Sequence, residues 1–415
     1  MKRLINTTLL LVILFPAGVV AQDIPVFSLD TVLNRIAAHN LLLQSFAYKA
    51  DSYREAAAGA NAWMAPMIGA GTFMTPYPGQ KVMDNDKGQL MLQLEQSIPN
   101  RAKQKAKEAW LISRSQAELA GRDVTWNDFR ATAKNLYSSW QTALKKIDVL
   151  RKNEALLLMM KKIEEVRLPY NQSLLGNIYK AEAAVEENRN RIIMEEGTIS
   201  EAMAMLNGMM NRQATLPFQV DTTFELVFTP VLVDTFDLAS SRKDIYRMDE
   251  NIRSMFSGIN AMELERKPEF RIRFDHMSPL GGMMPHAFSI MGMVSIPIAP
   301  WSSGMYKSEI RSMRSTIRSM ELERGAMLQE SMGRIYGMME QIRRMQKKLL
   351  GMKENVLPAL QRSMDVNLIG YQENRLALIT VIDSWEALTM MQLQVLEEEF
   401  ELSKMIISYE KELYR

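Results

Sequence analysis

Cysteine is absent from all 415 residues, and histidine occurs only three times. Disulfide bonds, thiolate nucleophiles and lipid attachment to an N-terminal cysteine are therefore excluded. The sequence also contains no glycine-rich phosphate loop and no histidine pair with metalloprotease spacing. We therefore expect a protein that is not an enzyme, that holds no cofactor and that has no resident metal site.

Long hydrophobic runs are also scarce. After the N-terminus, no apolar run reaches the roughly 18 residues that a membrane-spanning helix needs. The N-terminus itself, MKRLINTTLLLVILFPAGVVAQ, has two basic residues, a short apolar stretch and small residues up to Ala21. This pattern predicts a cleaved signal peptide at residues 1–21 and an exported, unlipidated protein. If the mature chain is integral to a membrane, a closed β-barrel is the remaining solution.

Charge of one sign is lacking too, because 50 basic and 48 acidic side chains give a net charge of +2. This balance argues against nucleic acid as a partner and predicts helix surfaces with many ion pairs. Helical periodicity extends over residues 28–65, 101–167 and 173–210, with Pro66 and Leu168-Pro169 as stop signals. The longest run would measure roughly 100 Å. Between the first two lie strand-like pieces at 66–76 and 88–99.

The same order of patterns returns about 200 residues later. A connector at 218–236 precedes a helical pattern at 237–266, strand pieces at 270–275 and 287–296, and a long helical run at 302–364. A turn at 367–370 and a last helix to Tyr414 complete it, and both strand pairs end in Ser-Ile-Pro. We therefore expect a signal peptide, a first repeat at 22–217, the connector, and a second repeat at 237–415.

The strand pieces alternate between apolar and polar side chains. A charge that faces lipid would cost about 2–4 kcal/mol in mid-bilayer, so the polar set should line a lumen. That set is Gln89, Gln93, Glu95, Arg271, Arg273 and Asp275. The residues expected to face lipid are Leu90, Leu92, Leu94, Phe288, Ile290, Val294 and Ile296. A soluble, half-buried sheet would show the same alternation.

Four strands are too few to close a barrel, for which about eight are needed. We expect three chains to pool twelve strands, while helices much longer than the bilayer core project into water as coiled coils. The predicted fold class is mainly α with a small β part, namely a long coiled-coil helical barrel plus a pooled transmembrane β-barrel, with an internal twofold repeat.

Export, a pooled barrel and duplicated long helices together resemble the TolC-type outer-membrane efflux family. The most specific local similarity is YQENRLALITVIDS, where Tyr371, Ile379, Val381, Ile382 and Asp383 match the family pattern. Asn374 stands where the family usually has Gly, Ala377 where Ser is usual, and Thr380 in place of the first of two aspartates. Asn is the best substitute for Gly if the backbone there is left-handed. A weaker echo, YNQSLLGNIYKAE, aligns Tyr170, Ile178 and Glu182 with Tyr371, Ile379 and Asp383.

The resemblance implies roles for the helix ends. Asp383, Thr380 and Glu182 would form the pore gate, where converging carboxylates repel one another and attract cations. The turns at Pro169, Tyr170, Gly370, Tyr371 and Asn374 would dock a periplasmic adaptor. Without the resemblance, these residues are a solvated helix carboxylate and ordinary helix-hairpin turns.

Methionine is unusually frequent, with 34 residues. Thioethers suit Cu(I), and the stretch between the last two strand pieces gathers Met277, Met283, Met284 and His286. Flexible packing is the other explanation, since Met313, Met320 and Met327 recur every seven residues.

These observations predict a homotrimeric exit duct in the outer membrane of a Gram-negative cell, with its helical part in the periplasm. It would passively conduct solutes, either copper and silver or small toxic compounds, from an inner-membrane efflux pump and its adaptor. The alternative is a periplasmic coiled-coil structural or adaptor protein without a pore.

Overall fold

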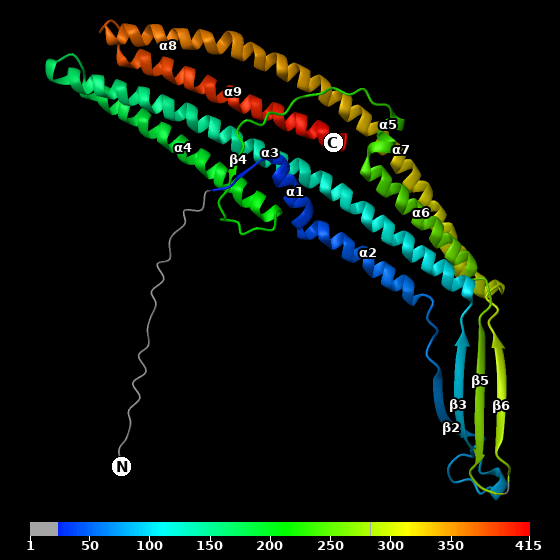
Figure 1. Cartoon of the computed structure of the whole chain (residues 1–415). Helices are drawn as coiled ribbons and strands as arrows, with labels where there is room; N and C mark the ends of the chain where they lie inside the picture. The colour runs from blue at the N-terminus through cyan, green and yellow to red at the C-terminus, as the bar shows by residue number, and fades with distance from the viewer. Residues whose placement is uncertain (1–23, 283) are drawn as a thin grey trace, which may run out of the picture.

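The computed structural model describes residues 24–282 and 284–415, so the predicted signal peptide lies outside the described residues. The chain is elongated, with a small sheet at one end and long helices that run away from it (Figure 1). Helix α3 (Arg101–Arg167) is a central element. Four other helices pack along it, namely α2 (Leu41–Gly59), α4 (Leu175–Met209), α6 (Lys243–Leu264) and α9 (Leu378–Glu412). The fold is therefore mainly helical, as the periodicity predicts.

Helix α3 has the bounds that the sequence predicts, because strong local signals mark both ends. The Asn100 side chain accepts a hydrogen bond from the Ala102 amide at the start. At the other end, the backbone passes into a single 3-10 turn, η2 (Leu168–Tyr170), which contains Pro169. Helix α4 (Leu175–Met209) then runs back along α3.

The two shorter predicted helices, 28–65 and 237–266, are each interrupted, which the periodicity did not predict. The first consists of α1 (Leu29–His39) and α2 (Leu41–Gly59), and the second of α5 (Thr235–Ser241) and α6 (Lys243–Leu264). Asn40 and Arg242 separate them in extended conformations, with ψ angles of 122° and 123°. The Asn40 side chain caps the start of α2 by accepting hydrogen bonds from the Leu42 and Leu43 amides. A single residue can therefore end one helix and cap the next.

The second long helix differs from the first. Helix α7 (Pro300–Gly351) leads into a π-helical turn, η3 (Met352–Val356), and then α8 (Leu357–Gln372). Pro358 lies just after the π turn, and proline lacks the amide that a regular helix would use. Since α8 continues through Gly370, the turn predicted at 367–370 is wrong, and the chain reverses at 373–377 before α9 (Leu378–Glu412).

Four antiparallel strands form the main sheet in the order β2, β3, β5, β6. They are β2 (Met67–Phe73), β3 (Gln89–Ile98), β5 (Phe270–Pro279) and β6 (Ala287–Val294), with the 3-10 turn η1 (Asp84–Asp86) in the loop between β2 and β3. β5 extends four residues beyond its predicted end, which shortens the following loop to 280–286. The two central strands, β3 and β5, come from different halves of the chain, so the sheet joins the two halves.

The helices are held by several separate cores along their length. One contains β1 (Val26–Phe27), β4 (Gln219–Val220), α1 and the middle of α3. Its buried Tyr137 donates to the carbonyl of Phe27 at 3.0 Å and accepts from the Asp221 amide at 2.7 Å, and burial raises its pKa to about 12. Other cores lie at the far helix ends and around α5, α7 and α9. An elongated molecule needs this arrangement, because its ends are too far apart to share one core.

Candidate functional site

The sheet separates apolar and polar side chains by register. Leu94 pairs with Phe274 and Phe274 with Ile290, while Gln93 pairs with Asp275. Directly paired residues project to the same face. We call one side the apolar face, formed by Leu90, Leu92, Leu94, Phe270, Ile272, Phe274, Phe288, Ile290 and Val294. The other side, the polar face, carries Gln89, Gln93, Glu95, Arg271, Arg273 and Asp275.

The two faces differ in electrostatics. On the polar face, Glu95 and Asp275 are 6% and 4% exposed and form ion pairs with Arg271 at 2.9 Å and Arg273 at 2.8 Å. Residues of the apolar face are 40% to 70% exposed, from Phe274 to Phe288. So large a contiguous apolar surface is unusual for a protein surrounded by water and marks an interaction surface. That this surface meets lipid, and that the polar face lines a lumen, stays a prediction.

Two details of the predicted sheet change. Ile296 is 69% exposed but lies beyond the end of β6, so it is not part of the apolar strand pattern. The second concerns the stretch between the strand pieces, in which Met283 lies outside the described residues. The pairing of His276 with Leu92 puts it on the apolar face, where Ser278 Oγ lies 3.3 Å from His276 Nε2 and 3.1 Å from His286 Nδ1. Met277 projects from the opposite face.

At the far end of the helices, two hairpin turns reverse the chain. Pro169 and Tyr170 are exposed in the first, which closes with Asn171 at a φ of 57°. Asn374 closes the second at a φ of 61°, so the left-handed backbone that the sequence required for an Asn-for-Gly replacement is present. Gly370 lies close to Leu376, since a Cβ there would be 2.9 Å from a Leu376 methyl group and would require that side chain to move.

Tyr371 belongs to the interior of this region, because its side chain is 1% exposed. Its hydroxyl donates to Glu164 Oε1 at 2.6 Å, and burial together with this carboxylate raises the pKa of Tyr371. Ser173 and Asn177 also donate to Glu164. Arg167 stacks on the Tyr371 ring at 4.8 Å and donates to the carbonyls of Tyr371 and Gln372. We call Glu164, Arg167 and Tyr371 the tip link, since they join the two hairpins.

Glu164 and Arg167 are functional candidates that the sequence reasoning missed. Glu164 is only 2% exposed, yet in the sequence it is one of many charges on a long helix. Its partner Tyr371 is 207 residues away, so no local pattern connects them. A weak signal was available, namely that Glu164 and Arg167 are one helical turn apart directly before the Leu168-Pro169 stop.

The three residues predicted to form a gate lie on two helices, α4 and α9. Thr380 and Asp383 lie on the exposed side of the first turns of α9. Glu182, on α4, is exposed and forms an ion pair with Lys161 of α3 at 3.2 Å. Whether Thr380 and Asp383 approach their equivalents in other chains stays a prediction.

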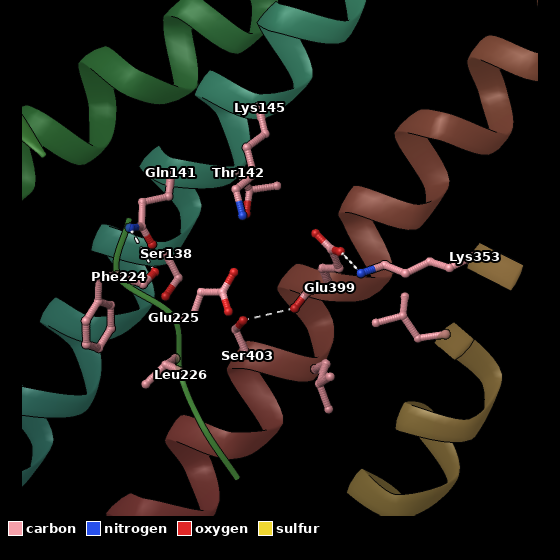
Figure 2. A pocket seen from close by; sticks show the side chains of 12 residues that line it. Ser138, Gln141, Thr142, Lys145, Phe224, Glu225, Leu226, Lys353, Glu399 and Ser403 are labelled. Atoms are coloured by element: carbon pink, nitrogen blue, oxygen red, sulfur yellow. Dashed lines mark hydrogen bonds and ion pairs between the residues drawn. The ribbon is translucent and has the colours of Figure 1, made fainter. Parts of the chain in front are cut away.

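A polar cavity of about 220 Å³ lies between the connector, α3 and α9 (Figure 2). Gln141 donates to the carbonyls of Asp221 and Phe224, Lys353 pairs with Glu399, and the Ser403 hydroxyl donates to the Glu399 carbonyl. The side chains around it offer hydroxyls, an amide and charged groups. The two hydrogen bonds from Gln141 hold the connector against α3.

Within 24–282 and 284–415, no helix combines the length and apolar character that membrane crossing requires. In the same ranges, no three or more His, Asp and Glu side chains gather into a potential metal site.

This architecture is that of the TolC-type outer-membrane channels. Similar solved structures include the outer-membrane channel CmeC of Campylobacter jejuni, with a TM-score of 0.73 at 11% identity over 93% of this chain and 85% of CmeC. The open-state channel MtrE of Neisseria gonorrhoeae has a TM-score of 0.70 at 14% identity, over 93% of this chain and 88% of MtrE. The outer-membrane protein VceC of Vibrio cholerae has a TM-score of 0.69 at 12% identity, over 93% of this chain and 95% of VceC. No sequence-family model and no curated protein matches the chain. CmeC and MtrE are channels and not enzymes, in agreement with the expectation from the sequence.

Proposed function

We propose that this chain is the outer-membrane exit duct of an efflux system and passively conducts solutes to the cell exterior. The observation that carries the proposal is the two-faced sheet. Its apolar face is broadly exposed, whereas its polar face pairs carboxylates with guanidinium groups. In a membrane, the first face would contact lipid and the second would line a water-filled lumen.

The duct requires more than one chain. β2 and β6 are the edge strands of the four-stranded sheet, and their outer edges have unpaired backbone groups. In a homotrimer, β6 of each copy would pair with β2 of the next and close a barrel of twelve strands. The recurrence of a broken helix, two strands, a long helix and a return helix supports the further proposal of an internal duplication.

The far helix ends would be the periplasmic entrance. Around a threefold axis, the exposed Thr380 and Asp383 of each copy would form the pore gate. Glu182 would contribute a further carboxylate to this gate. We retain Pro169, Tyr170 and Asn374 as contacts for a periplasmic adaptor, because all three are exposed. Tyr371 and Gly370 shape the turn from inside, and the tip link would hold the two hairpins of one chain together.

The proposed setting is the outer membrane, reached with the help of the signal peptide at residues 1–21, with the helices in the periplasm. Nothing in the chemistry of the described residues would couple energy to transport, so an inner-membrane pump would supply it. The duct itself would contribute a selective, water-filled path.

The test is expression of the full chain followed by extraction from outer membranes. We expect a band on gel electrophoresis that migrates as a trimer before heating and as a monomer after heating. The same material should produce stepwise ion conductance in planar bilayers. A water-soluble periplasmic monomer without conductance would contradict the proposal and favour the structural or adaptor alternative.

A further inference from the structure

The methionines of the main sheet are confined to one face. Met91 and Met277 pair directly across β3 and β5, so they project to the same side as their neighbours Gln93 and Asp275. Met67 pairs with Glu95, Met291 with Arg273, and Met293 with Arg271. All five thioethers therefore belong to the polar face.

The apolar face has a different composition. Its large apolar side chains on β2, β3, β5 and β6 are leucine, isoleucine, phenylalanine and valine, without a methionine. If methionine only replaced leucine as a flexible filler, it would occur on both faces. Packing does account for helix residues such as Met313 and Met339, which are 9% and 3% exposed. The strand methionines need another explanation.

Their positions form successive levels along the sheet. Met293 lies nearest the helices, Met67 and Met291 share the next level, and Met91 with Met277 lie two levels further toward the loops. Neighbouring levels are about 7 Å apart, and directly paired side chains are close enough for two thioethers to contact one ion. The carboxylates between them are already paired with Arg271 and Arg273. The donors that remain on this face are therefore neutral: the soft thioethers and the amide groups of Gln89 and Gln93.

We propose that the polar face is a thioether path for soft monovalent metal ions, copper(I) or silver(I), which are the cargo of the duct. Thioethers select such ions over hard cations. Several weak sites in sequence let an ion enter and leave, which conduction requires. This inference rests on the proposed function, since it takes the polar face as the lumen wall.

The experiment uses the full chain, purified in detergent, and silver(I) as the probe. In the test variant, Met67, Met91, Met277, Met291 and Met293 are all replaced by Leu, which keeps side-chain volume and removes sulfur. In the matched control variant, five exposed helix methionines, Met159, Met194, Met205, Met305 and Met390, are replaced by Leu. A double variant, Met91→Leu with Met277→Leu, is the second test protein in case the fivefold variant does not fold.

We expect calorimetric titration to show silver(I) binding that weakens by about tenfold or more in the test variant and is unchanged in the control. The double variant should lose part of this affinity. Equal silver binding in wild type and both variants would overturn the proposal. Loss of binding of an apolar dye, with silver binding intact, would also overturn it, because the thioethers would then serve as an apolar lining.

Conductance in planar bilayers separates this proposal from the proposed function. The test variant should keep its potassium conductance within about twofold, since Leu and Met fill similar volumes. Silver(I) should reduce the potassium current of wild type and control but not that of the test variant. A wild-type protein that never conducts refutes the duct, whereas a conducting protein insensitive to silver refutes only the metal path.

Discussion

At the scale of single residues, the tip link shows how a buried charge is accommodated where two hairpins meet. Glu164 accepts hydrogen bonds from Tyr371, Ser173 and Asn177. Because burial and the carboxylate raise the pKa of Tyr371, its hydroxyl stays protonated and remains a donor. The stability of the helix ends should therefore depend on this hydroxyl.

Replacing Tyr371 by Phe removes the donor and leaves the carboxylate in place. We expect the free energy of unfolding to fall by about 1.5–3 kcal/mol, the range for hydrogen bonds to charged groups. Amide hydrogen exchange of residues 371–380 should accelerate. The control is Tyr170→Phe, whose hydroxyl belongs to a side chain that is 73% exposed. Equal effects of the two substitutions would contradict the role of the link.

A second prediction for a single residue concerns the side-chain carboxylate of Glu412, at the end of α9. Burial would raise its pKa, but hydrogen bonds from Arg334 and Arg242 outweigh burial and hold the pKa below the usual 4.5. A lowered folded pKa contributes stability that is present above the unfolded pKa and is lost as pH falls through the folded value. Thermal stability should therefore decline as the pH falls below the usual 4.5 and through the lower pKa of the folded state.

The Glu412→Gln variant tests this sign. It should be less stable than wild type at neutral pH, by about 1–3 kcal/mol, and should lose less of its remaining stability on acidification. Melting followed by circular dichroism at several pH values measures both effects. Glu386→Gln, at an exposed position of α9, is the control and should leave the pH profile unchanged.

At the scale of elements, the turn between α8 and α9 depends on a left-handed residue. Asn374→Gly should be tolerated, whereas Asn374→Ala should cost about 1–2 kcal/mol, because a Cβ without a local hydrogen-bonding group disfavours this conformation. Unfolding midpoints of the two variants measure the difference. If Gly and Ala give the same midpoint, the φ of 61° is not what requires Asn at this position.

The sheet offers a matched pair of neighbouring residues on opposite faces. Leu92→Arg should reduce the amount of heat-sensitive trimer in the outer membrane, because a charge facing mid-bilayer lipid costs about 2–4 kcal/mol. Gln93→Arg should assemble normally and shift the conductance toward anions, since it adds positive charge to the lumen. The proposed orientation would be wrong if Gln93→Arg blocked assembly and Leu92→Arg did not.

How much the sequence predicts differs between elements for physical reasons. The bounds of α3 and the two faces of the sheet follow from caps, prolines and alternation, which are local. The breaks at Asn40 and Arg242 occupy one residue each, which is too short to interrupt the helical periodicity of the sequence. The turn at 373–377 contains neither Gly nor Pro, so no local stop signal marks it. The tip link depends on packing between segments 207 residues apart, which one sequence cannot reveal.

At the scale of the whole molecule, the sheet and the helices pose one assembly problem. The separate cores hold the helices of one chain together, but the sheet still ends in two open edges and exposes its apolar face. In the proposed ring, a second copy at each edge would satisfy the backbone groups, and closure would leave no edge. Closure at three copies is what the twelve-strand proposal requires.

The absence of cysteine makes this closure directly measurable, because any disulfide must come from engineered positions. We would place one cysteine on β2, at Ala70, and one on β6, at Ile290, with Phe288 and Gly292, which lie on the same face as Ile290, as alternative β6 sites for other registers. Mild oxidation in outer membranes should give cross-linked dimers and then trimers, and no larger species, since a closed ring has no free edge. Each single-cysteine variant is the control and should not form the ladder. Products that continue beyond three would indicate an open array, and the trimeric duct would have to be abandoned.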